Sequence, residues 1–132
     1  MRLDHIGIAV SDLQAAELLY VVALGGTVAF REELIEEHVR VVFIEAGGAL
    51  FELLAPTGDD GPLARFLRSR GEGLHHLAFE VPDVAATLRD AAVTGRRVID
   101  ERPRRGARGR LIAFLHPSAA RGVLVELVQR PP

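Results

Sequence analysis

Two histidines and two glutamates stand inside apolar stretches of this 132-residue chain: His5, Glu52, His76 and Glu126. A carboxylate buried among leucine and valine is costly unless it is hydrogen-bonded, ion-paired or bound to a cation. Two imidazole nitrogens and two carboxylate oxygens, in a chain with no cysteine, suit Co²⁺, Mn²⁺, Ni²⁺ or Zn²⁺, with water at the remaining positions. The histidines precede the glutamates by 47 and 50 residues, so only the fold can assemble such a site.

A repeat within the chain is the reason to expect these four side chains in one place. Residues 4–16 read DHIGIAVSDLQAA, and residues 75–87 read HHLAFEVPDVAAT. The two histidines match at an offset of 71 residues, and the two glutamates stand in matching leucine- and valine-rich segments at an offset of 74. A tandem duplication about a pseudo-twofold axis brings both His–Glu pairs around one cleft.

Each half of the chain shows the same order of local patterns, namely a strand, a helix and three strands. Apolar segments at 3–10 and 74–81 predict the first strands. An aspartate cap and a terminal glycine bracket each predicted helix: Asp12 and Gly25, then Asp83 and Gly95. The further strands are predicted near 27–33, 39–46 and 49–55, and near 97–100, 111–116 and 122–129.

These patterns predict an α+β fold of tandem βαβββ modules. Their eight strands are expected to form one curved, incompletely closed sheet around a metal cleft. We expect residues 1–132 to form a single domain, with module one at about 1–55, a linker helix at about 56–73 and module two at about 74–130. Pro62 stands near the first position of that short amphipathic helix.

Strand alternation separates the two histidines of the His75–His76 pair. His5 and His76 share their strand faces with small residues, whereas His75 lies on the face of the large apolar side chains. A face of small residues suits a cleft, and a face of large apolar residues suits packing under a helix. His5 and His76 are therefore predicted to face the cleft, and His75 is predicted to be structural.

The composition excludes several classes of protein. Sixteen basic and eighteen acidic side chains give a formal net charge of −2, which argues against a nucleic-acid or membrane-surface binder. The absence of cysteine removes disulfides, thiolate zinc sites and thiol nucleophiles. No apolar run reaches the roughly 18 residues of a spanning helix, and no signal-peptide pattern follows Met1. We therefore expect a soluble, cytoplasmic protein.

Five stretches carry a resemblance to a known family: LDHIGIAV at 3–10, ELLAP at 52–56, RGEGLHHLAF at 70–79, FLHP at 114–117 and GVLVEL at 122–127. With them the sequence resembles the vicinal oxygen chelate (glyoxalase-like) superfamily and, more narrowly, the methylmalonyl-CoA epimerases. The resemblance covers essentially the whole chain. The run around the paired histidines is more specific to the family than a lone histidine.

The resemblance implies a metal-dependent epimerase that inverts the α-carbon of methylmalonyl-CoA, or of a similar 2-acyl-CoA thioester, through an enolate. The family's ligands carry over to His5, Glu52, His76 and Glu126, with Glu or Gln found at the second of these positions. Co²⁺ is the foremost ion expected, the substrate is an acyl-CoA, and a homodimer is implied. Glu126 is the expected catalytic residue, as a ligand that also carries a proton.

Two positions depart from the family pattern, and one further segment has two interpretations. Val41 stands where certain epimerases carry a second acid/base glutamate, and Glu45 and Glu37 are weak substitutes that are better interpreted as solvated carboxylates. Ser118 replaces the lysine that often follows the FLHP motif. The segment Arg102–Arg110 gathers five arginines, which either attract a substrate phosphate or form a solvated basic loop.

Other functions remain as alternatives. A lactoylglutathione lyase-like isomerase would use the same four ligands, although the motif around 71–76 argues against it. A ring-cleaving dioxygenase needs two histidines and one carboxylate, so a fourth ligand disfavours it. A non-catalytic small-molecule-binding protein of the same fold needs no metal and leaves the four ligands unexplained. Of the remaining histidines, His116 is predicted to be structural or to support a ligand, and His38 to be exposed.

Overall fold

The computed structural model, which describes Met1–Pro132, repeats one order of elements in its two halves. The first half contains β1 (Arg2–Ala9), α1 (Leu13–Leu18), β2 (Thr27–Leu34), β3 (Val39–Ala46) and β4 (Ala49–Pro56). The second half contains β5 (Gly73–Val81), α3 (Val84–Val93), β6 (Arg104–Arg105), β7 (Leu111–Leu115) and β8 (Val125–Gln129). Between them lies α2 (Pro62–Arg70), which begins at the predicted proline. The βαβββ order is confirmed.

The strands follow the hydrogen-bonded order β2-β3-β4-β1-β5-β8-β7-β6 in one eight-stranded sheet, which confirms the α+β fold. In each half, the first strand pairs in parallel with the last strand, and the other neighbours are antiparallel. Gly7 lies opposite Glu52 in the first parallel pair, and Ala78 lies opposite Glu126 in the second. A small residue thus faces each glutamate across the ladder.

The chain divides into two compact units whose boundaries fall inside strands. The first unit is His5–His75, and the second unit combines Met1–Asp4 with His76–Pro132. The boundaries cut β1 between Asp4 and His5, and β5 between His75 and His76. The chain's first four residues therefore belong to the second unit.

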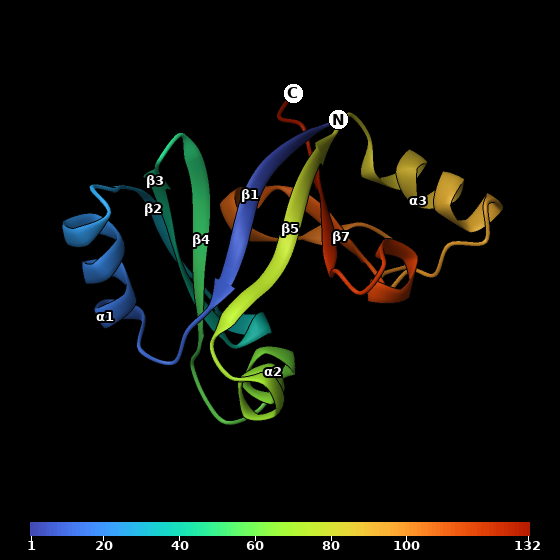
Figure 1. The fold of residues 1–132 in the computed structure, drawn as a ribbon. Helices are drawn as coiled ribbons and strands as arrows, with labels where there is room; N and C mark the ends of the chain where they lie inside the picture. The colour runs from blue at the N-terminus through green and yellow to red at the C-terminus, as the bar shows by residue number, and fades with distance from the viewer. The chain divides into compact units, whose positions relative to one another are not determined.

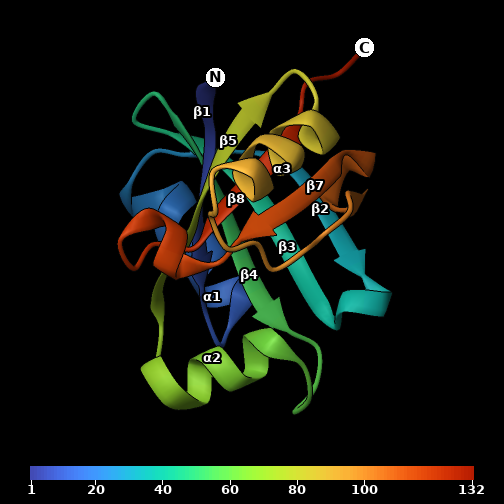
Figure 2. The same ribbon diagram turned by 90° about the vertical axis from the view of Figure 1, so that its right-hand side faces the viewer.

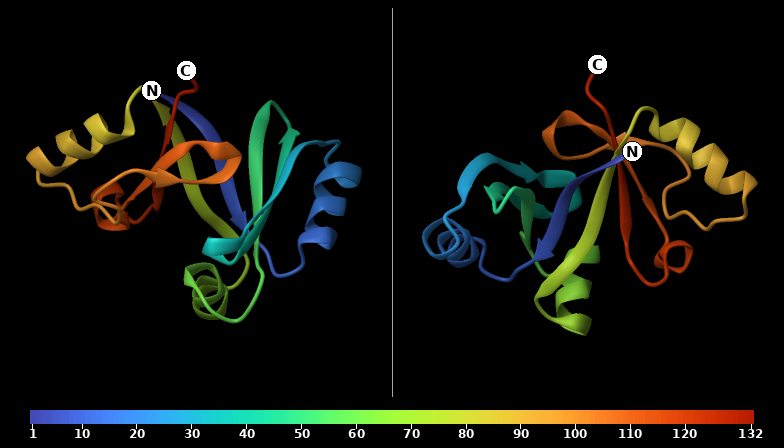
Figure 3. Two further views of the ribbon diagram at one scale, coloured as in Figure 1. Left: turned by 180° about the vertical axis from the view of Figure 1, so that it is seen from behind. Right: turned by 45° about the horizontal axis from the view of Figure 1, so that its top comes forward.

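In the first unit, α1 lies against β3 and β4 (Figures 1 and 3). The buried side chains Val42, Ile44 and Leu53 pack with partly buried neighbours that include Ile8 of β1 and Tyr20. Ile8 therefore faces the helix, on the side of β1 away from His5, as strand alternation predicts. Burial raises the pKa of the Tyr20 phenol, since desolvation disfavours its ionised form.

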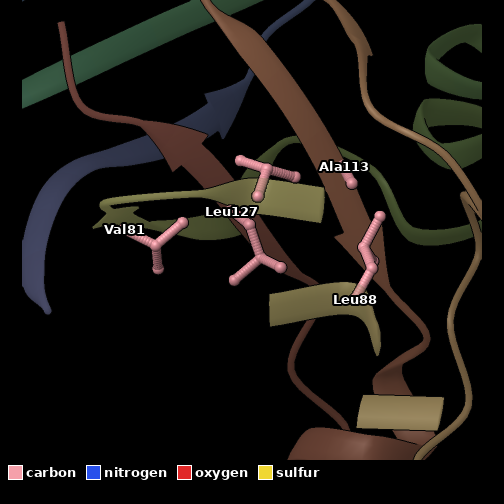
Figure 4. Close-up of a cluster of buried hydrophobic side chains, with 5 residues drawn as sticks. Val81, Leu88, Ala113 and Leu127 are labelled. Atoms are coloured by element: carbon pink, nitrogen blue, oxygen red, sulfur yellow. The ribbon is translucent and has the colours of Figure 1, made fainter. Parts of the chain in front are cut away.

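In the second unit, α3 packs on β7 and β8 (Figure 2). The core between this helix and the strands consists of five buried side chains: Val81, Val84, Leu88, Ala113 and Leu127. All of them except Val84 are labelled in Figure 4. None of the helices has the length and apolar character that crossing a membrane requires.

Both helices that follow a first strand have the predicted aspartate cap. The Asp12 carboxylate accepts a hydrogen bond from the Ala15 N–H at 3.0 Å, and the Asp83 carboxylate accepts one from the Ala86 N–H at 3.1 Å. The first helix continues as a π-helix over Leu19–Ala23. The two aspartate carboxylates therefore satisfy backbone N–H groups that have no partner within their own helix.

The predicted strand near 97–100 is wrong. Val98 forms only an isolated bridge to Leu115, and the two-residue strand β6 lies further along the chain, opposite Leu111 and Ile112 of β7. The physical reason is the Asp100 side chain, which accepts the Phe114 N–H at 2.8 Å. A strand partner's carbonyl would otherwise have accepted that hydrogen bond, so the ladder cannot run through this point.

Candidate metal centre

In the first unit, β1 and β4 bring His5 and Glu52 together. The His5 Nε2 lies 3.1 Å from a Glu52 carboxylate oxygen, and both side chains are buried. The His5 ring contacts the ring of Phe43 of β3 in a T-shaped arrangement, with centroids 5.3 Å apart and planes at 81°. This unit therefore contains one buried imidazole–carboxylate pair beside an aromatic ring.

In the second unit, β5 and β8 bring His76 and Glu126 together in the same manner. The His76 Nε2 lies 3.8 Å from a Glu126 carboxylate oxygen, and both residues are again buried. Phe114 of β7 contacts the His76 ring in a T-shaped arrangement, with centroids 5.8 Å apart and planes at 90°. The duplication thus extends from the sequence to the local geometry.

The two phenylalanines are site residues that the sequence analysis missed. Phe43 is paired in register with Glu52, and Phe114 is paired in register with Glu126. The signal that could have found them was available, because Phe43 and Phe114 are separated by the same 71 residues as the two histidines. Neither residue can bind a metal or carry a proton, so an inventory of polar groups passes over both.

Each His–Glu pair fits a divalent ion. Two ligand atoms that each lie about 2.1 Å from an ion cannot be more than about 4.2 Å apart, and both measured separations, 3.1 and 3.8 Å, satisfy that limit. In both pairs the imidazole presents Nε2 to the carboxylate. The four residues are a group of histidines and glutamates that could hold a metal ion, which would also explain why two carboxylates are buried.

The other histidines have structural surroundings. His75 packs against Phe66 of α2, with centroids 4.8 Å apart, as predicted for the structural member of its pair. The His116 Nδ1 accepts the Ser118 N–H at 3.1 Å and caps a 3-10 helix over Pro117–Ala120. His38 is exposed, as predicted.

The glutamates weighed as substitutes for a second acid/base group lie in different surroundings. Val41 is buried within β3. Glu45 is exposed further along the same strand, which agrees with a solvated carboxylate, and Glu37 lies in a 3-10 helix over Ile35–Glu37.

The arginine-rich segment is more structured than a solvated basic loop, which was one of its two interpretations. Arg110 is 3.1 Å from Glu80 and 3.7 Å from Asp4, and Arg108 also forms an ion pair with Asp4. Arg104 is 3.1 Å from Asp100. Three of the five arginines therefore bind carboxylates of the second unit. The sequence signal for this network was Glu80, because it is a charged residue in an apolar strand and lies on the same face as His76.

Comparison with known proteins adds the family. A sequence profile described as the glyoxalase/bleomycin resistance protein/dioxygenase superfamily matches residues 4–114. The mitochondrial methylmalonyl-CoA epimerase of Bos taurus is 40% identical over 129 residues, which cover 97% of this chain and 74% of that protein. The ethylmalonyl-CoA/methylmalonyl-CoA epimerase of Cereibacter sphaeroides is 39% identical and is covered to 97%, as is this chain.

A solved structure agrees with these sequence matches. A single-residue variant of Streptomyces coelicolor methylmalonyl-CoA epimerase, in complex with 2-nitronate-propionyl-CoA, is similar with a TM-score of 0.92. The identity is 41%, and the match covers 98% of this chain and 94% of that one. The similarity therefore extends over both units and both His–Glu pairs.

Proposed function

Since this chain belongs to the glyoxalase/bleomycin resistance protein/dioxygenase superfamily, and within it to the methylmalonyl-CoA epimerases, we propose that it inverts the α-carbon of methylmalonyl-CoA or of a similar 2-acyl-CoA thioester. The observation that carries the proposal is the buried His–Glu pair, which occurs once in each unit with the same strand pairing and the same aromatic neighbour. An acyl-CoA substrate is supported by the relative that was solved with an acyl-CoA analogue.

His5, Glu52, His76 and Glu126 would hold the divalent ion. Their donor set of two nitrogens and two oxygens suits Co²⁺, Mn²⁺, Ni²⁺ or Zn²⁺, and the family resemblance favours Co²⁺ among them. When bound, the ion supplies Lewis-acid stabilisation of the negative charge that develops as the α-proton leaves. The burial of all four side chains supports this role, because charge stabilisation is stronger where water is excluded.

Glu126 is the residue assigned to carry the proton. Inversion requires proton exchange on both faces of the α-carbon, and therefore two acid/base groups or one mobile group. Glu126 lies 3.8 Å from its histidine, and Glu52 lies 3.1 Å from its own. The family resemblance, in which Glu or Gln occupies the position of Glu52, favours Glu126 as the group that carries the proton.

The test is α-proton exchange in D₂O over a panel of acyl-CoA thioesters, followed by mass spectrometry. We expect methylmalonyl-CoA to gain one deuterium with metal-loaded protein and none after chelation, with Co²⁺ restoring the exchange. Binding of acyl-CoA without exchange would support a non-catalytic small-molecule-binding protein of the same fold. Turnover of a glutathione hemithioacetal in its place would support a lactoylglutathione lyase-like isomerase. Either result rejects the epimerase.

A cytoplasmic location and a homodimeric assembly stay part of the proposal. The homodimer rests on the family resemblance, and sedimentation at micromolar concentration tests it directly. Only a 14.3 kDa species in that experiment would remove the dimer. Cell fractionation in the source organism tests the location.

A further inference from the structure

Three neighbouring strands contribute one side chain each to a row in each unit, in which the phenylalanine is in register with the glutamate and the histidine stands two residues before the glutamate's partner in its strand. In the first unit, Phe43, Glu52 and His5 come from the neighbouring strands β3, β4 and β1. The equivalent row in the second unit comes from β7, β8 and β5: Phe114, Glu126 and His76. In both rows the glutamate strand lies between the other two, so that an aromatic ring and an imidazole flank the carboxylate.

The aromatic ring also touches the imidazole. The two T-shaped contacts have interplanar angles of 81° for His5–Phe43 and 90° for His76–Phe114. Such a geometry is favoured by the quadrupole of the rings, and turning the imidazole about its χ2 bond would disrupt it. Each phenylalanine therefore restricts the plane in which the ligand histidine presents Nε2 to its glutamate.

Phe114 is backed by an arginine and an aspartate. Behind Phe114, the Arg104 guanidinium lies over the ring at 5.6 Å from its centroid. The Asp100 carboxylate accepts hydrogen bonds from the Arg104 Nε at 3.1 Å and from the Phe114 N–H at 2.8 Å. Phe114 is thus fixed through both its ring and its backbone.

Phe43 is supported by a second aromatic ring. Its ring packs against Phe30 of the edge strand β2, with centroids 6.3 Å apart, and Phe30 is 38% exposed. The strand that carries Phe30 has a register shift between Val28 and Phe30. The first row therefore ends at the irregular edge of the sheet.

We propose that Phe43 and Phe114 are positioning residues for the ligand histidines, and that Asp100 and Arg104 hold the Phe114 ring in place against His76. This inference rests on the proposed metal function. It assigns a role to Arg104 that differs from attracting a substrate phosphate, because its charge is directed at an aromatic ring and an aspartate.

The test compares three phenylalanine-to-leucine substitutions, each of which removes the aromatic ring that contacts a different histidine. Phe114→Leu and Phe43→Leu remove the contacts to the two ligands, and Phe66→Leu removes the equivalent edge contact to His75, which is not a ligand. Calorimetric titration of each metal-free protein with Co²⁺ gives the affinity, and its melting temperature without metal gives the stability. The visible spectrum of bound Co²⁺ reports the ligand geometry.

We expect Phe114→Leu and Phe43→Leu to weaken Co²⁺ binding about tenfold, the scale of losses when a group that orients a ligand is removed. Phe66→Leu should lower the melting temperature without changing the affinity or the spectrum. Phe114→Tyr, which keeps the ring, should retain the affinity. Should Phe114→Leu fail to fold, Phe43→Leu and Arg104→Gln in the parent protein decide the question.

Arg104→Gln tests whether Arg104 holds the Phe114 ring in place. It should weaken Co²⁺ binding in the parent protein and have no further effect in the Phe114→Leu background, because the guanidinium acts through the ring. Equal effects in both backgrounds would overturn that role of Arg104, and unchanged affinity in both ligand-side leucine variants would overturn the positioning role. Failure of the parent protein to bind Co²⁺ would instead overturn the metal function on which the inference rests.

Discussion

At the scale of single residues, the two glutamates of the candidate centre have similar surroundings but differ in their distance from the paired histidine. Both are buried in strands of leucine and valine, but Glu52 lies 0.7 Å closer to its histidine, at 3.1 Å against 3.8 Å for Glu126. Replacement of either by glutamine keeps the size and one ligating oxygen, and it removes the charge and the capacity to accept a proton. The two substitutions therefore separate ligation from proton transfer.

We expect Glu126→Gln to keep much of the metal and to lose α-proton exchange by about 10²–10⁴-fold, the usual contribution of a general acid/base group. Glu52→Gln should be milder, since it removes a ligand charge without removing the proton carrier. The measurements are metal content by elemental analysis and deuterium incorporation by mass spectrometry. Exchange at the parent rate in metal-loaded Glu126→Gln would show that the proton carrier lies elsewhere.

The adjacent histidines of β5 give a second prediction. His76→Ala should weaken metal binding by more than about 100-fold, because loss of a ligand exceeds the 10–100-fold cost of losing a group that orients one. His75→Ala should keep the metal and lower the melting temperature, because it removes the contact with Phe66. Metal titration and thermal unfolding of both variants check the assignment, and exchanged effects would reverse the faces of β5.

Strand alternation was enough to separate His75 from His76, because a strand directs successive side chains to opposite faces. The helix caps were equally predictable, since Asp12 and Asp83 each bond a backbone N–H only three residues away. Phe43 and Phe114 were missed because their contribution is shape and orientation. Such contributions depend on which strands become neighbours, and a search for chemically active groups does not consider them.

At the scale of elements, carboxylates and arginines of the second unit join the start of β1 to β5 and to the segment before β7. The Arg110 side chain is only 12% exposed, and it lies between Glu80 at 3.1 Å and Asp4 at 3.7 Å. Removing one partner from a buried ion pair leaves an uncompensated charge in a poorly solvated place. The arginines of this segment are therefore predicted to differ widely in their effect on stability.

Arg110→Met should lower the free energy of unfolding by about 1–3 kcal/mol, because the buried Glu80 carboxylate loses a donor, while Arg108 still pairs with Asp4 and Arg130 with Glu80. Arg105→Met is the matched control: the Arg105 residue is exposed, and its guanidinium donates only to the Gly109 carbonyl at 3.1 Å. Its cost should stay within about 0.5 kcal/mol. Urea unfolding of both variants measures the difference, and equal costs would contradict the network.

The strand predicted near 97–100 failed for a reason that composition alone does not reveal. Valine and isoleucine at positions 98 and 99 favour a strand, but the Asp100 side chain accepts the hydrogen bond of the Phe114 N–H. Tertiary packing determines whether a side-chain carboxylate replaces the carbonyl of a strand partner as the hydrogen-bond acceptor. Local propensity therefore gave the correct number of strands and the wrong position for the shortest one.

At the scale of the whole molecule, metal binding should act as a stabilising ligand. Any ion that binds only the folded protein adds about 2.7 kcal/mol at a free concentration 100 times its dissociation constant. Saturating Co²⁺ should therefore raise the melting temperature by several degrees, and chelation should reverse the rise. His76→Ala should abolish the shift, whereas His75→Ala should keep it. A shift that survives in His76→Ala would place the ion elsewhere.

The membership of Met1–Asp4 in the second unit also has a consequence for synthesis on the ribosome. The pair of Asp4 and Arg108 joins residues 104 apart in the chain, whereas His5 and Glu52 can meet as soon as β4 has emerged. At about 5–20 residues per second, several seconds of elongation separate these two events. A nascent chain can therefore bring His5 and Glu52 together before residues 57–110 are made, whereas Asp4 meets Arg108 and Arg110 only after them.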